Sequence, residues 1–69
     1  MTTIEDAAAI STAIENAGRP LTLTEAGHAA RISRFRTWRA VRSGVGDGTF
    51  TYVRVGSRWL IDNIGIPDI

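Results

Sequence analysis

The sequence predicts one small, mainly α-helical domain in which three helices are followed by a two-stranded β-hairpin. Three observations support this fold class. Apolar residues recur at helical spacing in three stretches before residue 45, and glycine, proline or capping residues separate these stretches. Residues 49–61 are instead rich in β-branched and aromatic residues. We treat residues 1–69 as a single domain, since a chain of this size buries only about 60% of its unfolded surface around one core.

The composition narrows the ways in which so small a core can be stabilised. There is no cysteine, which excludes disulfides and thiolate zinc sites, and the single histidine, His28, cannot hold a metal alone. We therefore expect neither a metal nor a cofactor. No apolar run approaches the roughly 20 residues that span a membrane, and the N-terminus is acidic rather than basic as in a signal peptide. We expect a cytoplasmic protein without a membrane partner.

The first helix is expected over residues 4–17, where small and branched apolar residues fall at helical spacing. Thr2 with Glu5 fits a capping box at its start, and Thr3 is the alternative N-cap. Gly18 offers a C-terminal stop.

The second helix is expected over residues 23–30. Thr22 and Glu25 form a second capping-box pattern directly before its apolar stripe. Gly27 lies in the helix interior, where glycine costs up to about 1 kcal/mol relative to alanine, and we read it as a place where another helix approaches closely. We expect His28 on the surface or at the boundary of the core, with no catalytic role, because no partner for it is evident.

The third helix is expected over residues 34–43, with Ser33 as N-cap and Gly44 as the residue that ends it. Only Arg31 and Ile32 separate it from the second helix. This short connection is typical of the tight turn of a helix-turn-helix.

The hairpin is expected over residues 49–61, with Gly56-Ser57 as a two-residue loop that favours a type II′ turn. Residues 62–69 form a C-terminal tail without a clear period. Three helices followed by a hairpin is the plan of the winged helix-turn-helix, in which the hairpin is the wing. The apolar residues at matching positions predict one core, formed by Ile10, Ile14, Leu21, Leu23, Ala26, Ile32 and Val41.

Positive charge is concentrated in the middle of the chain. Residues 1–30 carry a net charge of −3, residues 31–59 carry +6 and the last ten residues carry −2. All eight basic residues are arginine, which contacts phosphate and guanine in a bidentate way that lysine cannot. Such a distribution is typical of a polyanion site on one face and favours double-stranded DNA as the partner.

Two rotational phases of the third helix are compatible with the sequence. In the first, Thr37 faces the core while Phe35 and Trp38 face outward. In the second, Phe35 and Trp38 are buried and Thr37 is exposed. Arg36 and Arg39 face outward in both phases, and we expect them to contact bases or phosphates in the major groove.

Other candidate contacts lie at the helix start and in the wing. Ser33 and Arg34 are at a helix N-terminus, which favours phosphate. Arg54 and Arg58 flank the hairpin tip on opposite faces, and minor-groove or phosphate contact is the natural role for one of them. We expect Trp59 in the core. The complete set of candidate DNA-binding residues is Ser33, Arg34, Phe35, Arg36, Trp38, Arg39, Arg42, Arg54 and Arg58.

Four segments resemble the phage excisionase family and its MerR-like winged-helix relatives. These are Thr22–Ala26, Ile32–Arg34, Val41–Gly44 and Val53–Ile61, of which the last, with its Arg-Val-Gly-x-Arg tip, is the most specific. The family usually has a turn glycine where this chain has Arg31.

The resemblance implies a helix in the major groove and a wing at the minor groove, with Ser33, Arg34, Arg54 and Arg58 at matching positions. Excisionases bend an attachment site and steer an integrase toward excision, whereas the relatives regulate transcription. The expected function is sequence-specific binding of double-stranded DNA, as a recombination directionality factor or a small transcriptional regulator. An integrase or another protein partner, and a homodimer or cooperative assembly on DNA, are the expected partners.

One alternative is a winged-helix protein-interaction module that does not bind DNA. In that case Phe35, Trp38 and the tail from residue 64 to 69 would contact a protein, and an exposed apolar patch would favour it. An enzyme is not expected, because the sequence has no paired carboxylate near a base, no glycine-rich phosphate loop and no nucleophile with a histidine beside it.

Overall fold

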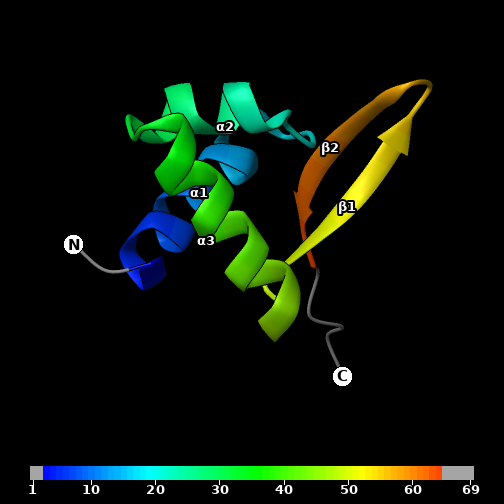
Figure 1. Cartoon of the computed structure of the whole chain (residues 1–69). Coiled ribbons are helices and arrows are strands. Elements are labelled where there is room, and N and C mark those ends of the chain that lie inside the picture. The colour runs from blue at the N-terminus through cyan, green and yellow to red at the C-terminus, as the bar shows by residue number, and fades with distance from the viewer. Residues whose placement is uncertain (1–2, 65–69) are drawn as a thin grey trace.

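The computed structural model describes residues 3–64 and confirms the predicted fold class. Three helices, α1 (Thr3–Ala17), α2 (Leu23–Ala30) and α3 (Arg34–Asp47), precede the strands β1 (Phe50–Val55) and β2 (Arg58–Asn63). The helices pack together and the hairpin projects beyond them as a wing (Figure 1). The predicted Thr2–Glu5 capping box and tail residues 65–69 lie outside the described part, and Thr3 is the first residue of α1 rather than its cap.

The start of α2 has the predicted capping box. The Glu25 N–H donates to Thr22 Oγ1 at 3.1 Å, and the Thr22 N–H donates to Glu25 Oε1 at 3.0 Å. Arg19 adds an ion pair to the same carboxylate at 3.1 Å. The Arg19 guanidinium and then the Thr22 N–H hold the pKa of Glu25 at about 2, below its ordinary value of 4.5. The linker is thus fastened to the first turn of α2.

The turn between α2 and α3 depends on one close approach and one left-handed residue. A Cβ on Gly27 would lie 2.7 Å from Thr37 Oγ1, so the predicted role of Gly27 as a contact point between helices is confirmed. Arg31 has φ 58° and ψ 44°, a conformation that costs a residue with a Cβ about 1–2 kcal/mol. The chain therefore makes the tight turn with arginine where the excisionase-like pattern has glycine.

The predicted end of α3 at residue 43 is wrong. The helix continues to Asp47, and Gly48, with φ 89°, is its C-cap. Gly44 lies inside the helix because the Phe50 ring packs against it, and a Cβ there would lie 2.7 Å from Phe50 Cε2. Gly44 therefore does not end the helix; its missing side chain leaves the space into which Phe50, the first residue of β1, packs.

The hairpin has the predicted Gly56-Ser57 turn between paired strands, with Val55 opposite Arg58. The second strand extends two residues beyond the predicted end at 61, to Asn63. Ile61 also pairs with Leu21 of the α1–α2 linker through two backbone hydrogen bonds of 3.0 and 2.6 Å. This bridge ties the base of the wing to the helical layer.

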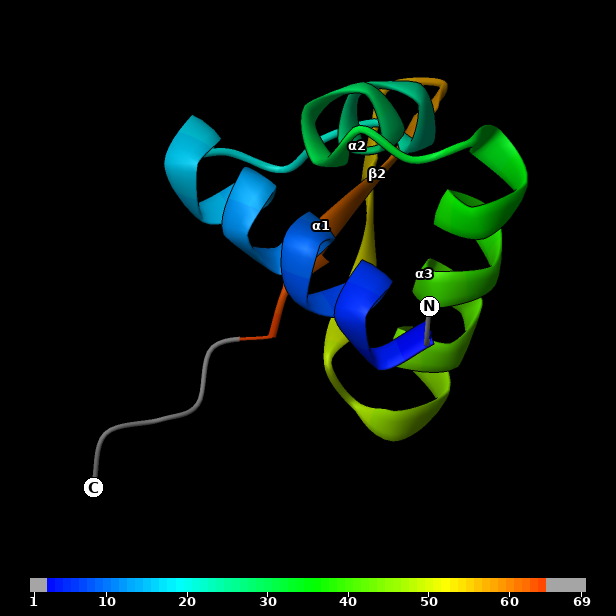
Figure 2. The ribbon, with the colours of Figure 1, turned by 90° about the vertical axis from the view of Figure 1, so that its left-hand side faces the viewer.

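The core lies where the three helices and the base of the hairpin meet, and α1 crosses in front of that base in Figure 2. Five of the seven predicted core residues are buried, and Leu23 and Ile32 are partly buried against them. Ala40, Phe50 and Ile61 complete the core, so the hairpin contributes two apolar side chains that the prediction omitted. The buried apolar residues are Ile10, Ile14, Leu21, Ala26, Ala40, Val41, Phe50 and Ile61.

Two glycines of α3 should respond oppositely to alanine. Gly44→Ala forces its methyl group into the Phe50 ring, and overpacking of this kind costs about 1–3 kcal/mol. Gly46→Ala meets nothing within 4 Å and should stabilise the helix by up to about 1 kcal/mol. Denaturant unfolding of both variants checks this, and a Gly44→Ala variant as stable as Gly46→Ala would contradict the packing of Phe50.

Candidate nucleic-acid interface

The structure selects the first of the two predicted phases of α3. Thr37 is fully buried together with the small and branched residues on its side of the helix. Its Oγ1 donates to the Ser33 carbonyl at 2.8 Å, which satisfies the buried hydroxyl. Phe35 is 65% exposed and Trp38 is 44% exposed, so the phase that buried both rings is wrong.

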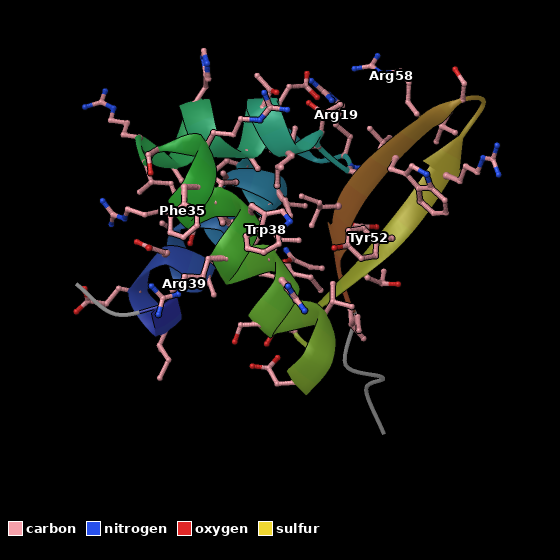
Figure 3. The ribbon with its side chains drawn as sticks, viewed as in Figure 1. Arg19, Phe35, Trp38, Arg39, Tyr52 and Arg58 are labelled. Carbon is pink, nitrogen blue, oxygen red and sulfur yellow. The ribbon has the colours of Figure 1, made fainter. Side chains whose placement is uncertain are left out.

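The outward face of α3 consists of Phe35, Trp38, Arg39 and Arg42, all of them exposed. Their spacing of three, four and seven residues places them on one side of a helix. Figure 3 shows the first three on the side of α3 that faces the viewer. Ser33 and Arg34, at the start of the helix, are exposed as well. Six of the nine predicted contact residues are therefore exposed on α3 or at its start.

Arg36 does not face outward as both phases predicted. Its Nε and Nη2 donate to Asp6 Oδ2 at 3.1 Å and Oδ1 at 2.6 Å, so two parallel hydrogen bonds join α3 to α1. The Arg36 side chain is only 31% exposed, and that of Asp6 is 11% exposed. Sequence periodicity missed this because Arg36 lies on the flank of α3 that α1 covers, and the position of α1 is a tertiary feature.

The Asp6–Arg36 pair also shifts the titration of both groups. The hydrogen bond from Arg36 is the main cause that lowers the pKa of Asp6 below its ordinary 3.8, against a smaller opposite effect of burial. The hydrogen bond to Asp6 likewise raises the pKa of Arg36. The pair therefore remains charged at neutral pH and holds α3 against α1.

The ion pairs separate the eight arginines into two groups. Within residues 3–64, Arg19 and Arg36 are the two that pair with a carboxylate, and both pairs fasten parts of the fold together. The other arginines are exposed and have no carboxylate within ion-pair distance in that range. They are Arg31, Arg34, Arg39, Arg42, Arg54 and Arg58.

The hairpin places its two arginines on opposite faces, as predicted. Arg54 is paired across the strands with Trp59, and Arg58 with Val55. The Arg54 guanidinium lies 5.6 Å from the centre of the Trp59 ring, and its Nε donates to the Gly56 carbonyl at 3.2 Å. Trp59 is 60% exposed, so its expected place in the core is wrong: the outer half of the hairpin extends past the helices, and Phe50 fills the core at its base.

The described residues contain no group of three or more metal-ligating side chains, and none of the helices in that range is long and apolar enough to cross a membrane. His28 is exposed, as predicted.

No protein-family model, curated protein or solved structure matches the chain at a significant level. The function must therefore be inferred from the exposed side chains on α3 and the hairpin.

Two neighbouring arginines of α3 should differ in their effect on stability. Arg36→Ala leaves the nearly buried Asp6 carboxylate without its guanidinium, so it should lower the melting temperature clearly. Arg39→Ala is an exposed substitution on the outward face and should change the free energy of unfolding by about 0.5 kcal/mol or less. Thermal denaturation at neutral pH checks this, and an equal loss in both variants would contradict a structural role for Arg36.

The same pair predicts a pH dependence. Because the folded pKa of Asp6 lies below its ordinary value of 3.8, the pair stabilises the fold above that pH and loses its effect as the pH falls through the folded value. The gap in melting temperature between the parent and Arg36→Ala should therefore narrow in acid. A gap that stays constant down to the acid limit of folding would show that the ion pair is not its source.

Proposed function

We propose that this protein binds double-stranded DNA, with the outward face of α3 in the major groove and the hairpin alongside on the backbone or minor groove. One observation carries the proposal: the arginines that the fold does not use, six in all, are exposed on α3, the preceding turn and the hairpin. Arginine forks match both phosphate oxygens and the guanine edge, so such a surface suits DNA.

The shape of α3 supports the same proposal. Fourteen residues give a helix roughly 21 Å long, and a helix fits into the major groove of B-DNA, which is about 12 Å wide. Its first turn presents backbone N–H groups beside Arg34, of which the Arg36 N–H is already bonded to Ser33 Oγ. The positive end of the helix and Arg34 together favour a phosphate there.

The resemblance to excisionases favours two biological roles for this DNA binding. One is to steer an integrase toward excision, and the other is to regulate transcription as a small phage-type protein. Either role would place the protein on the nucleoid or on phage DNA, as a dimer or a cooperative assembly. An integrase gene beside this one would favour the first role.

A protein-interaction module is the second candidate, because the rings of Phe35 and Trp38 stack on the surface with centroids 6.2 Å apart. Exposed apolar patches of this kind can mark protein interfaces. A parent protein that binds no duplex even at low salt would favour this candidate over DNA binding.

Arg39→Ala should weaken binding to duplex DNA. If Arg39 contacts a guanine, the loss is about 1–3 kcal/mol and preference relaxes at one base pair; if it contacts a phosphate, affinity falls for every sequence and the salt slope drops by about one. Arg19→Ala is the matched control, because it removes the same charge from the linker. A fluorescence-anisotropy titration across salt concentrations checks both, and equal affinities for Arg39→Ala and the parent would refute the role of α3.

Removing Arg54 and Arg58 together should weaken duplex binding with little change in sequence preference. Wing arginines mainly position a protein on the backbone, and phosphate contacts carry little sequence information. Competition between related and unrelated duplexes measures this. Unchanged affinity of the double variant at physiological salt would show that the wing does not touch DNA.

A further inference from the structure

Most aromatic side chains of this chain lie on its surface rather than in its core. Of the five aromatic residues, Phe50 alone is buried, while Phe35, Trp38, Tyr52 and Trp59 are each at least 44% exposed. Large aromatic side chains ordinarily contribute much of the apolar core, and a small domain has few such groups to spare. The exposure of four aromatic side chains therefore indicates a binding surface for a ligand or partner molecule.

The two rings of α3 form a stack with an arginine. Phe35 and Trp38 lie with their ring centroids 6.2 Å apart and their planes 29° apart. Arg42, one turn further along, places its guanidinium 5.3 Å from the Trp38 ring centre. We refer to Phe35, Trp38 and Arg42 as the α3 triad.

The hairpin repeats this arrangement. Tyr52 meets Trp59 edge to face with centroids 6.3 Å apart, and Arg54 lies over the Trp59 ring at 5.6 Å. We refer to Tyr52, Arg54 and Trp59 as the hairpin triad. The pairing of the strands puts it on the same face as Phe50, which packs on α3. In Figure 3, Tyr52 lies on the side of the hairpin nearer α3.

Neither surface carries an acidic residue. The outward face of α3 has none, and the hairpin face of the triad adds only Phe50, Ile61 and Asn63, because Asp62 is on the opposite face. Within each triad the exposed rings are thus combined with arginine alone. Bases stack on aromatic rings and on guanidinium planes, while their phosphates neutralise the arginines. An apolar protein partner would instead have to bury both guanidinium groups without a counter-charge, which is costly.

In a duplex the base faces are stacked on one another, so a protein ring reaches base edges, sugars and phosphates. Unpaired bases expose their faces and can stack on a protein ring. We infer that the two triads bind single-stranded DNA by stacking unpaired bases on Trp38 and Trp59. This inference rests on the proposed DNA-binding surface but adds a second form of DNA as its ligand.

Titration of the full chain with an oligothymidylate of about ten nucleotides, followed by tryptophan fluorescence, tests the inference. We expect binding with quenching of the tryptophan emission. An abasic oligomer of equal length supplies the same phosphates without bases, and it should bind at least about fivefold more weakly and quench little. Equal affinity for the two oligomers would overturn the inference, because charge alone would then account for binding.

Single variants locate the contact. Trp38→Ala and Trp59→Ala should each weaken oligothymidylate binding by about five- to a hundredfold, and Trp59→Phe should retain much of the affinity. Val55→Ala is the matched control, because Val55 is an exposed apolar residue on the opposite hairpin face. Far-UV circular dichroism verifies that each variant is folded. Alanine variants that are folded and bind like the parent would overturn the inference.

A duplex titration separates this inference from the proposed function. A parent protein that binds duplex but no oligothymidylate at low salt would overturn the stacking inference and leave duplex binding in place. A parent protein that binds neither form would overturn both.

Discussion

The rotation of α3 about its own axis is the constraint on which the surface of this protein depends. Two contacts set that rotation from different sides. Gly27 lets α2 approach the buried Thr37 closely, and Asp6 of α1 holds Arg36 through two hydrogen bonds. Because successive residues of a helix are about 100° apart, a shift of one position would bury Trp38 or expose Thr37. The ion pair of Arg36 with Asp6 thus determines which side of the molecule the other arginines of α3 face.

The position of the hairpin follows from how its base is held. Phe50 fits into the notch that Gly44 leaves in α3, and Ile61 pairs with Leu21 of the linker. Beyond these anchors the strands extend past the helices, so their outer residues are exposed except for the paired Val53 and Leu60, which are half-buried. The base of the wing is therefore part of the core, whereas its outer half is a surface that carries Arg54, Arg58 and Trp59.

Local signals in the sequence were sufficient for much of this fold. The capping box at Thr22 and the turn at Gly56 each depend on residues near one another in the chain. A glycine inside a helical pattern was enough to indicate the close approach at Gly27, although its partner Thr37 lies on the next helix. Arg36 and Trp59 could not be placed in this way. The partner of Arg36 lies 30 residues away, and the exposure of Trp59 depends on how far the wing extends beyond the helices. The sequence limited α3 to two possible rotations about its axis. The contacts of α3 with α1 and α2 were needed to choose between them.

The proposed division of the arginines, between those that hold the fold together and those that contact DNA, can be tested by NMR. The experiment records the Nε–Hε signals of all arginines while duplex DNA is added. Arg36 should give a protected signal in the free protein, because its Nε donates to Asp6. On addition of duplex, the signals of Arg39, Arg42 and Arg34 should shift strongly, whereas those of Arg36 and Arg19 should move little. Shifts as large at Arg36 as at Arg39, or none on the outward face of α3, would contradict the account.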